Sequence, residues 1–192
     1  MAIGLRALPL LLLASGALAS GGTPPEIRPR IANGVATTAS PEVAMIFTAD
    51  GGTCTATLVG CRTLLTAAHC LCSADGRGAP CADGTSAEDP RDLLAFLPHV
   101  GLLGIEGVRV APNYQFGLAG DLAVLDLISP VRGVRPRRIN ETARPPLGTP
   151  ATILGFGVTS EGGADAGILR AGLVTTESCN GLVPDATHVC WT

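Results

Sequence analysis

The sequence predicts an all-β fold, either an antiparallel barrel or a sandwich. Short apolar or alternating runs recur from Glu42 onward, each about as long as an ordinary strand. Clusters of Gly, Pro, Asp and Asn separate these runs, as turns separate antiparallel strands. Helical periodicity never lasts beyond two turns, and only Ala67–Cys70 suggests a helical turn. The expected strands are Glu42–Thr48, Thr53–Val59, Arg62–Thr66, Asp92–Leu97, Gly107–Ala111, Leu122–Leu127, Ala151–Gly155, Ile168–Thr175 and Asp185–Cys190.

Two long segments lack strand patterns. Leu71–Arg91 is polar and contains two cysteines, so we expect a surface loop. Pro130–Pro150 holds five Arg and five Pro, and we expect it to connect two lobes. The hydrophobic content of 46% is enough for a core and argues against disorder. The net charge of −3, with no basic run of five or more, argues against nucleic-acid binding.

The N-terminus predicts export. Arg6 precedes an apolar stretch, and Ala17-Leu18-Ala19 is a small-x-small cleavage signal, so residues 1–19 are expected to be a signal peptide. The alternative is a membrane anchor, but the stretch is shorter than the roughly 20 residues that a span needs. No other segment is long and apolar enough, so we expect no membrane partner. Seven cysteines also fit a secreted, extracellular protein.

Two short segments carry residues suited to acid–base chemistry. In Thr66-Ala67-Ala68-His69-Cys70, small neighbours leave the imidazole room to meet a nucleophile, and a pKa of about 6.5 suits proton transfer at neutral pH. In Gly120-Asp121-Leu122-Ala123-Val124-Leu125, a carboxylate opens an apolar strand and needs a polar partner. Alone, a histidine is more often structural, and an aspartate before a strand is more often a turn residue.

Taken together, the two segments resemble the histidine and aspartate motifs of trypsin-like serine proteases, in that family's order of His, Asp and Ser. Other segments resemble the family in the same chain order. Arg30-Ile31-Ala32-Asn33-Gly34 is similar to its activation site, and Gly155-Phe156-Gly157 to its Gly-Trp-Gly stretch, with Phe for Trp. Cys54 and Cys70 have the spacing of the family's histidine-loop disulfide.

The resemblance implies two six-stranded antiparallel β-barrels, the second incomplete. A pro-segment would cover residues 20–30 and a peptidase domain residues 31–192, with a first barrel at about 31–130, a linker at about 130–150 and a partial second barrel at 151–192. His69 would be the general base, and Asp121 would orient it. The family's Gly-Asp-Ser-Gly-Gly motif does not occur in the sequence, so we expect the nucleophilic serine to be absent and this chain to be inactive.

The same resemblance implies a polypeptide substrate, no cofactor, and activation by a protease that cuts between Arg30 and Ile31. It also pairs Cys179 with Cys190. Cys61, Cys72 and Cys81 then remain, and either Cys72–Cys81 or Cys61–Cys72 is possible. A zinc site of His69, Cys70, Cys72 and Cys81 matches no standard spacing, so we expect no metal.

The sequence also allows two other interpretations. The chain could be a non-catalytic binding protein that keeps a protease scaffold. It could also be a non-functional fragment with exposed sheet edges, prone to aggregation. The presence of both His69 and Asp121 favours the protease.

Overall fold

A computed structural model describes residues 34–192 except 161, 182 and 185. The expected signal peptide, pro-segment and cleavage site at Arg30 and Ile31 therefore lie outside the described residues. Within the described part, strands dominate and the helical segments are two single turns of 3₁₀ helix. The strands are β1 (Val35–Ala36), β2 (Val43–Phe47), β3 (Thr53–Gly60), β4 (Thr63–Thr66), β5 (Cys72–Ser73), β6 (Ser86–Ala87), β7 (Leu94–Leu97), β8 (Gly101–Val110), β9 (Ala123–Leu127), β10 (Pro150–Gly155), β11 (Arg170–Glu177) and β12 (Cys190–Trp191); the 3₁₀ turns are η1 (Ala68–Cys70) and η2 (Pro90–Asp92).

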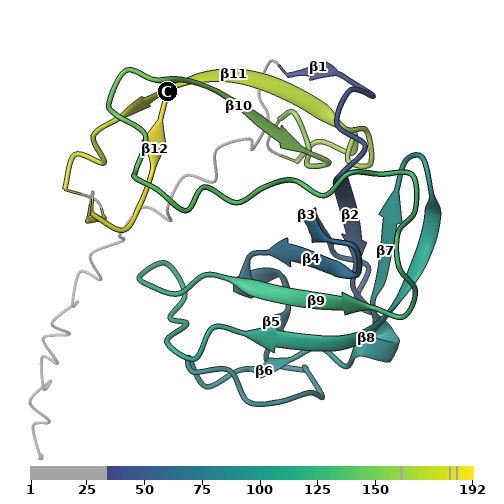
Figure 1. The fold of residues 1–192 in the computed structure, drawn as a ribbon. Helices are drawn as coiled ribbons and strands as arrows, with labels where there is room; N and C mark the ends of the chain where they lie inside the picture. Colours follow the sequence, from purple (N-terminus) through teal and green to yellow (C-terminus); the bar gives the residue numbers. More distant parts are fainter. Residues whose placement is uncertain (1–33, 161, 182, 185) are drawn as a thin grey trace, which may run out of the picture.

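Six strands close into an antiparallel barrel in the order β2-β3-β4-β9-β8-β7, which is the lower lobe in Figure 1. Every second residue of β9 points inward, and Ala123, Leu125 and Leu127 are buried. Their side chains meet those of β2, β3 and β4, including Ile46, Leu58 and Leu64, in one apolar core. The expected all-β fold is confirmed.

The upper lobe in Figure 1 is a four-stranded sheet in which β11 pairs with β1, β10 and β12. A second, smaller core joins this sheet to the barrel, because Val43 and Met45 of β2 pack against Phe156 and Leu169 beside β10 and β11. Residues 130–149 connect the lobes without forming a strand, and Figure 1 shows this linker crossing between them.

Two expected strands and one expected loop differ from the structure. β8 begins at Gly101, six residues before the expected start, because its first half pairs with β7. β12 covers only Cys190–Trp191, since the backbone N–H groups of Thr187 and His188 donate to the Pro184 carbonyl oxygen in a turn. The loop at 71–91 holds the small β5–β6 ladder, which was not expected.

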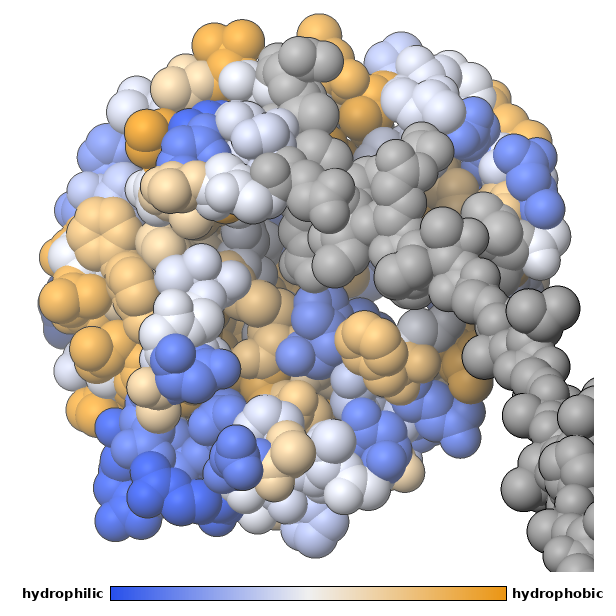
Figure 2. Space-filling view, turned by 180° about the vertical axis from the view of Figure 1, so that it is seen from behind, coloured by the Kyte–Doolittle hydropathy of each residue, from blue (hydrophilic) through white to orange (hydrophobic). Residues whose placement is uncertain are grey.

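Apolar and polar side chains are intermixed on the outside of the molecule. Figure 2 shows hydrophobic patches beside strongly hydrophilic areas on one face. Leu102, Leu118 and Leu173 are among the large apolar residues that are exposed. No helix in the described part of the chain is long and apolar enough to cross a membrane.

Candidate active site

His69 is held on a short turn whose neighbours are anchored in the barrel core. After β4 the chain is extended at Ala67 and then makes the single turn η1. The Leu71 backbone N–H donates to the Ala68 carbonyl oxygen at 2.9 Å, and both Ala68 and Leu71 are completely buried. The His69 side chain is 24% exposed. The imidazole is therefore fixed at its base and still reachable from solvent.

Strand register brings Asp121 to His69 across 52 residues of sequence. β4 and β9 are antiparallel, and Thr66 lies opposite Ala123. The segment after β4 and the segment before β9 therefore emerge at the same end of the barrel. Gly120 makes the sharp approach to Asp121, with a φ of 61° that disfavours other residues. A Cβ there would also lie 2.8 Å from backbone atoms of Asn113.

The Asp121 carboxylate binds His69 through both of its oxygens. Oδ2 lies 2.7 Å from the imidazole Nδ1, and Oδ1 accepts the His69 backbone N–H at 2.9 Å. An ionised carboxylate can only accept, so Nδ1 carries the proton of this bond. In the neutral imidazole, Nε2 is then the ring nitrogen that carries no proton.

The surroundings keep Asp121 ionised. Partial burial raises the pKa of this carboxyl group, but the hydrogen bonds from the His69 backbone and imidazole, with smaller help from the imidazole charge and the Ala68 N–H, outweigh it. The net pKa lies below the ordinary value of 3.8. Burial raises the pKa of the Tyr114 phenol, and the charges of Asp83 and Asp121 raise it further, so the phenol stays neutral.

Phe116 forms an apolar wall beside the imidazole. Its ring meets that of His69 edge to face, with centroids 6.1 Å apart and an interplanar angle of 85°. The turn that carries it is closed by the Gln115 N–H, which donates to the Ala119 carbonyl oxygen at 2.8 Å. Phe116 is nonetheless 70% exposed. A bound chain could therefore cover this ring while it occupies the site.

Disulfide bonds surround the histidine turn. Cys54 of β3 is bonded to Cys70, directly after His69. Cys72 is bonded to Cys81, one of the two pairings that spacing allowed, and Cys61 is an exposed free thiol. Disulfide bonds therefore include the sulfur atoms of all three cysteines considered as zinc ligands, Cys70, Cys72 and Cys81, which are not thiolates. Ligand atoms of Cys54, His69 and Cys70 lie within 4.8 Å of one another because that disulfide sits against the imidazole.

Thr55 couples the second sheet to the strand that leads to His69. Its hydroxyl accepts the Phe156 backbone N–H at 3.0 Å, and its carbonyl oxygen accepts the Thr66 hydroxyl at 2.9 Å. Phe156, which takes the place of the family's Trp, is itself buried. A short chain of contacts therefore runs from the second sheet to the end of β4.

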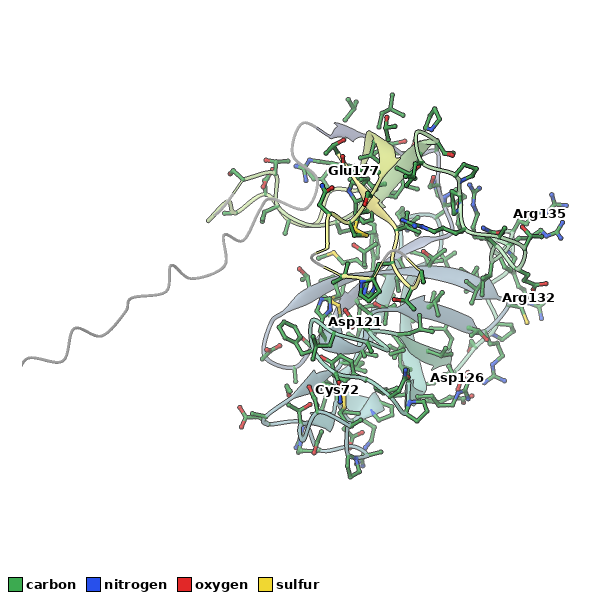
Figure 3. All side chains as sticks on the ribbon, turned by 90° about the vertical axis from the view of Figure 1, so that its left-hand side faces the viewer. Cys72, Asp121, Asp126, Arg132, Arg135 and Glu177 are labelled. Atoms are coloured by element: carbon green, nitrogen blue, oxygen red, sulfur yellow. A yellow bond between two sulfur atoms is a disulfide. The ribbon has the colours of Figure 1, made fainter. Side chains whose placement is uncertain are left out.

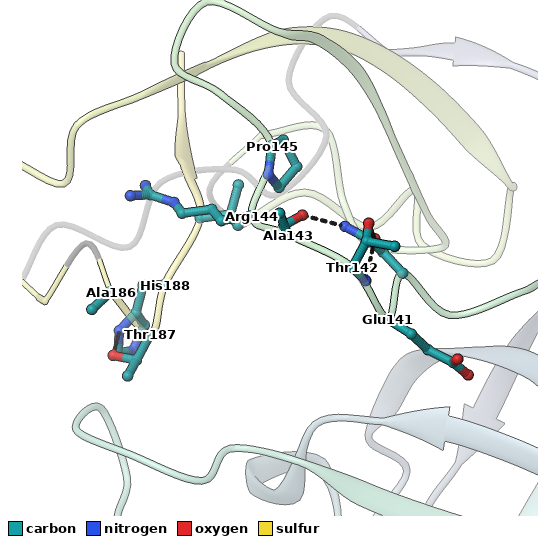
Figure 4. A pocket seen from close by; sticks show the side chains of 10 residues that line it. Glu141, Thr142, Ala143, Arg144, Pro145, Ala186, Thr187 and His188 are labelled. Atoms are coloured by element: carbon teal, nitrogen blue, oxygen red, sulfur yellow. Dashed lines mark hydrogen bonds between the residues drawn. The ribbon is translucent and has the colours of Figure 1, made fainter.

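A separate pocket of about 330 Å³ lies between the linker and the segment before β12 (Figure 4). Within its rim, the Asn140 side chain donates to the Ala143 carbonyl oxygen and accepts from Thr142. Neither His69 nor Asp121 lines this pocket. Its lining residues are Asn140, Glu141, Thr142, Ala143, Arg144, Pro145, Ala186, Thr187, His188 and Val189.

The structure brings His69, Asp121, Cys54 and Cys70 together at one end of the barrel. Cys179 and Cys190, also singled out in the sequence, are bonded to each other, and this bond ties the segment after β11 to β12. Sequence reasoning missed Phe116 and Thr55. For Phe116, the available signal was an aromatic residue five positions before Asp121. For Thr55, no local sequence feature indicates a role in the site.

Comparisons with known proteins identify the family to which this sequence is similar. The family model described as Trypsin matches residues 31–190. The chain is also similar to "Transmembrane protease serine 9" of Rattus norvegicus, with 35% identity over 145 residues. That alignment covers 68% of this chain and only 12% of the rat protein, so the chain spans about an eighth of its relative's length.

Proposed function

Because the chain belongs to the trypsin family, we propose that it supplies the general base and the orienting carboxylate of a secreted serine endopeptidase. The observation that carries this proposal is the double contact of Asp121 with the backbone and the ring of His69. A carboxylate that only capped a turn would need the backbone N–H alone. Binding Nδ1 as well fixes the ring tautomer, which is what a general base requires.

The proposed chemistry is acyl transfer to water. A serine hydroxyl attacks the scissile carbonyl carbon while Nε2 of His69 takes its proton, and the imidazolium that forms is stabilised by Asp121. The proton then passes to the departing amine, and water releases the acyl group by the same route in reverse. Polypeptides are the substrate class that this family implies. The exposed Phe116 ring supports an apolar substrate side chain next to the scissile bond.

The sequence motif that carries the nucleophilic serine in this family was not found in the 192 residues. None of their serines stands in a Gly-Asp-Ser-Gly-Gly sequence. We therefore propose that these residues alone do not hydrolyse peptides by the covalent route. Their contribution would be to hold His69, the general base, and Asp121, its orienting carboxylate, in position.

Export and activation complete the proposal. Three disulfide bonds support an oxidising compartment, in agreement with the expected signal peptide at residues 1–19. The family match begins at Ile31, the residue that cleavage after Arg30 would make the new N-terminus. A protease that prefers basic residues would make this cut. N-terminal sequencing after brief treatment with such a protease should read Ile-Ala-Asn-Gly, and resistance of the Arg30–Ile31 bond would contradict this step.

The decisive experiment starts from the source genome. Downstream of the Thr192 codon, a Gly-Asp-Ser-Gly-Gly coding sequence in any frame supports the protease, and its absence favours a non-catalytic protease-like binding protein. The product extended through that motif should react with a fluorophosphonate probe. Asp121→Asn should lower its kcat by about 10⁴-fold, the size of the effect in related triads. The 192-residue chain should stay unlabelled, and labelling would reveal a nucleophile among its own residues.

A further inference from the structure

Four arginines form a basic strip along the linker between the lobes. Arg132, Arg135, Arg137 and Arg138 are all exposed, and residues 132–138 contain no acidic side chain. The whole chain has a net charge of −3, so this strip opposes the overall charge. These seven residues span at most about 25 Å of extended chain, which makes the strip a short linear row of positive charge.

The strip lies on a fixed backbone. The N–H of Val131 donates to the Cys61 carbonyl oxygen at 2.7 Å, and the N–H of Arg137 donates to the Leu58 carbonyl oxygen at 2.7 Å. Between these two bonds, Val134 packs against the barrel core, and Val131 is only 6% exposed. The valines therefore face inward while the arginines face solvent. A ligand would meet these charges with little ordering of the backbone still to be done.

Most of these charges are unsatisfied within the described part of the chain. There, Arg132, Arg135 and Arg138 form no ion pair, and Arg137 reaches Glu42 only at 3.8 Å. By contrast, arginines elsewhere are held by carboxylates in closer pairs. These are Arg62 with Glu106, Arg77 with Asp92, Arg91 with Asp89, Arg109 with Asp126, and Arg170 with Asp165.

The strip is remote from the candidate active site. Asp121 precedes β9, whereas the linker begins after the opposite end of that strand. In Figure 3, Arg132 and Arg135 project from the edge of the molecule, well apart from Asp121. A ligand on the strip would leave the His69–Asp121 pair open to substrate.

We propose that the basic strip is a docking surface for an anionic polysaccharide that carries sulfate or carboxylate groups. Guanidinium groups bind such oxyanions through paired N–H donors, and a row of fixed charges suits a linear polymer. No aromatic residue occurs in residues 130–149, so the stacking platform that single-stranded nucleic acids use is missing. The proposed export would place the strip where extracellular polysaccharides occur, and the proposal is otherwise independent of the catalytic one.

Binding of the full 192-residue chain to heparin fragments tests the proposal, with neutral dextran as the blank. Replacing Arg132, Arg135 and Arg138 together by Ala should weaken binding at low salt by about a hundredfold, since one surface arginine contributes about a factor of five. The logarithm of the affinity should also depend less steeply on the logarithm of salt concentration, by about two to three in slope. Lysine at the same three positions should restore only part of the affinity, because it keeps the charge but not the paired N–H donors of a guanidinium group.

The matched control replaces Arg77, Arg91 and Arg109 by Ala, which changes the net charge equally on other parts of the surface. This control should bind heparin nearly as well as the unaltered chain. Equal losses in the two triple variants would overturn the proposal, because binding would then follow net charge. Tighter binding to DNA or to phosphatidylserine vesicles at the same salt would overturn the assignment to polysaccharide, as would failure of the unaltered chain to bind heparin. Circular dichroism and melting curves check that all variants fold.

Discussion

Removing the Cys54–Cys70 disulfide should disturb the His69–Asp121 pair as well as the stability of the barrel. The bond closes a loop with a sequence separation of 16. The entropy of such a loop in the unfolded chain makes it worth about 3 kcal/mol, so Cys54→Ala/Cys70→Ala should lower Tm by about 6–12 °C. Because Cys70 follows His69 directly, the turn η1 should also lose its tie to β3.

The Cys72–Cys81 disulfide provides a matched control. Its sequence separation of 9 gives a similar contribution of about 2.5 kcal/mol. It joins the loop at 71–91 to itself, so Cys72→Ala/Cys81→Ala should leave the pair in place. The two double variants therefore separate lost stability from lost positioning of the site.

The carboxyl ¹³C resonance of Asp121, followed against pH, measures the positioning. In the unaltered chain the midpoint should lie below 3.8. The pair therefore stabilises the fold fully above the unfolded pKa of about 3.9, and this contribution is lost as pH falls through the lower, folded pKa. Loss of Cys54–Cys70 should move the midpoint up toward 3.8, and loss of Cys72–Cys81 should not. Equal movement in both variants, or none in the first, would refute the idea that this disulfide positions His69.

Three further outcomes are expected from the described contacts. Thr55→Val should cost about 1–3 kcal/mol in urea unfolding because the Phe156 N–H loses its acceptor, whereas Thr57→Val on the same face of β3 should change stability by less than about 0.5 kcal/mol. Leu125→Ala should cost about 2–5 kcal/mol, since this side chain is fully buried in the barrel core, and a cost below about 1 kcal/mol would show that the core is not packed as described. Native protein should react with a thiol reagent at one cysteine per chain, and Cys61→Ser should abolish the reaction; a second reactive thiol would mean that one of the disulfides is not formed.

Local pattern was enough to predict the strands that line the barrel core. Residues 43–47, 53–60, 63–66 and 123–127 form strands within about one residue of expectation, because alternating burial leaves a period of two in the sequence. A strand of two residues is too short to show this alternation in the sequence. Val35–Ala36 is a strand only because Ala171 and Arg170 lie opposite it, which is a long-range pairing.

The candidate site was predictable in part, and for a different reason. Nothing local links His69 to Asp121, and only resemblance to a family paired them before the register of Thr66 with Ala123 showed how they meet. The edge-on contact of Phe116 depends on how a loop folds back on itself, and loop conformations have no sequence period. The pairing of Cys72 with Cys81 likewise needed coordinates, because spacing allowed a second choice.

Two backbone hydrogen bonds hold residues 131–137 against β3 and the residue that follows it, and this limits which part of the linker can bend. A connection of about twenty residues would ordinarily act as a long, slack tether. Here the first third of the linker is bound to the barrel by the hydrogen bonds from Val131 to Cys61 and from Arg137 to Leu58. Any bending within the linker must therefore be taken up beyond Arg138, where the chain continues to β10.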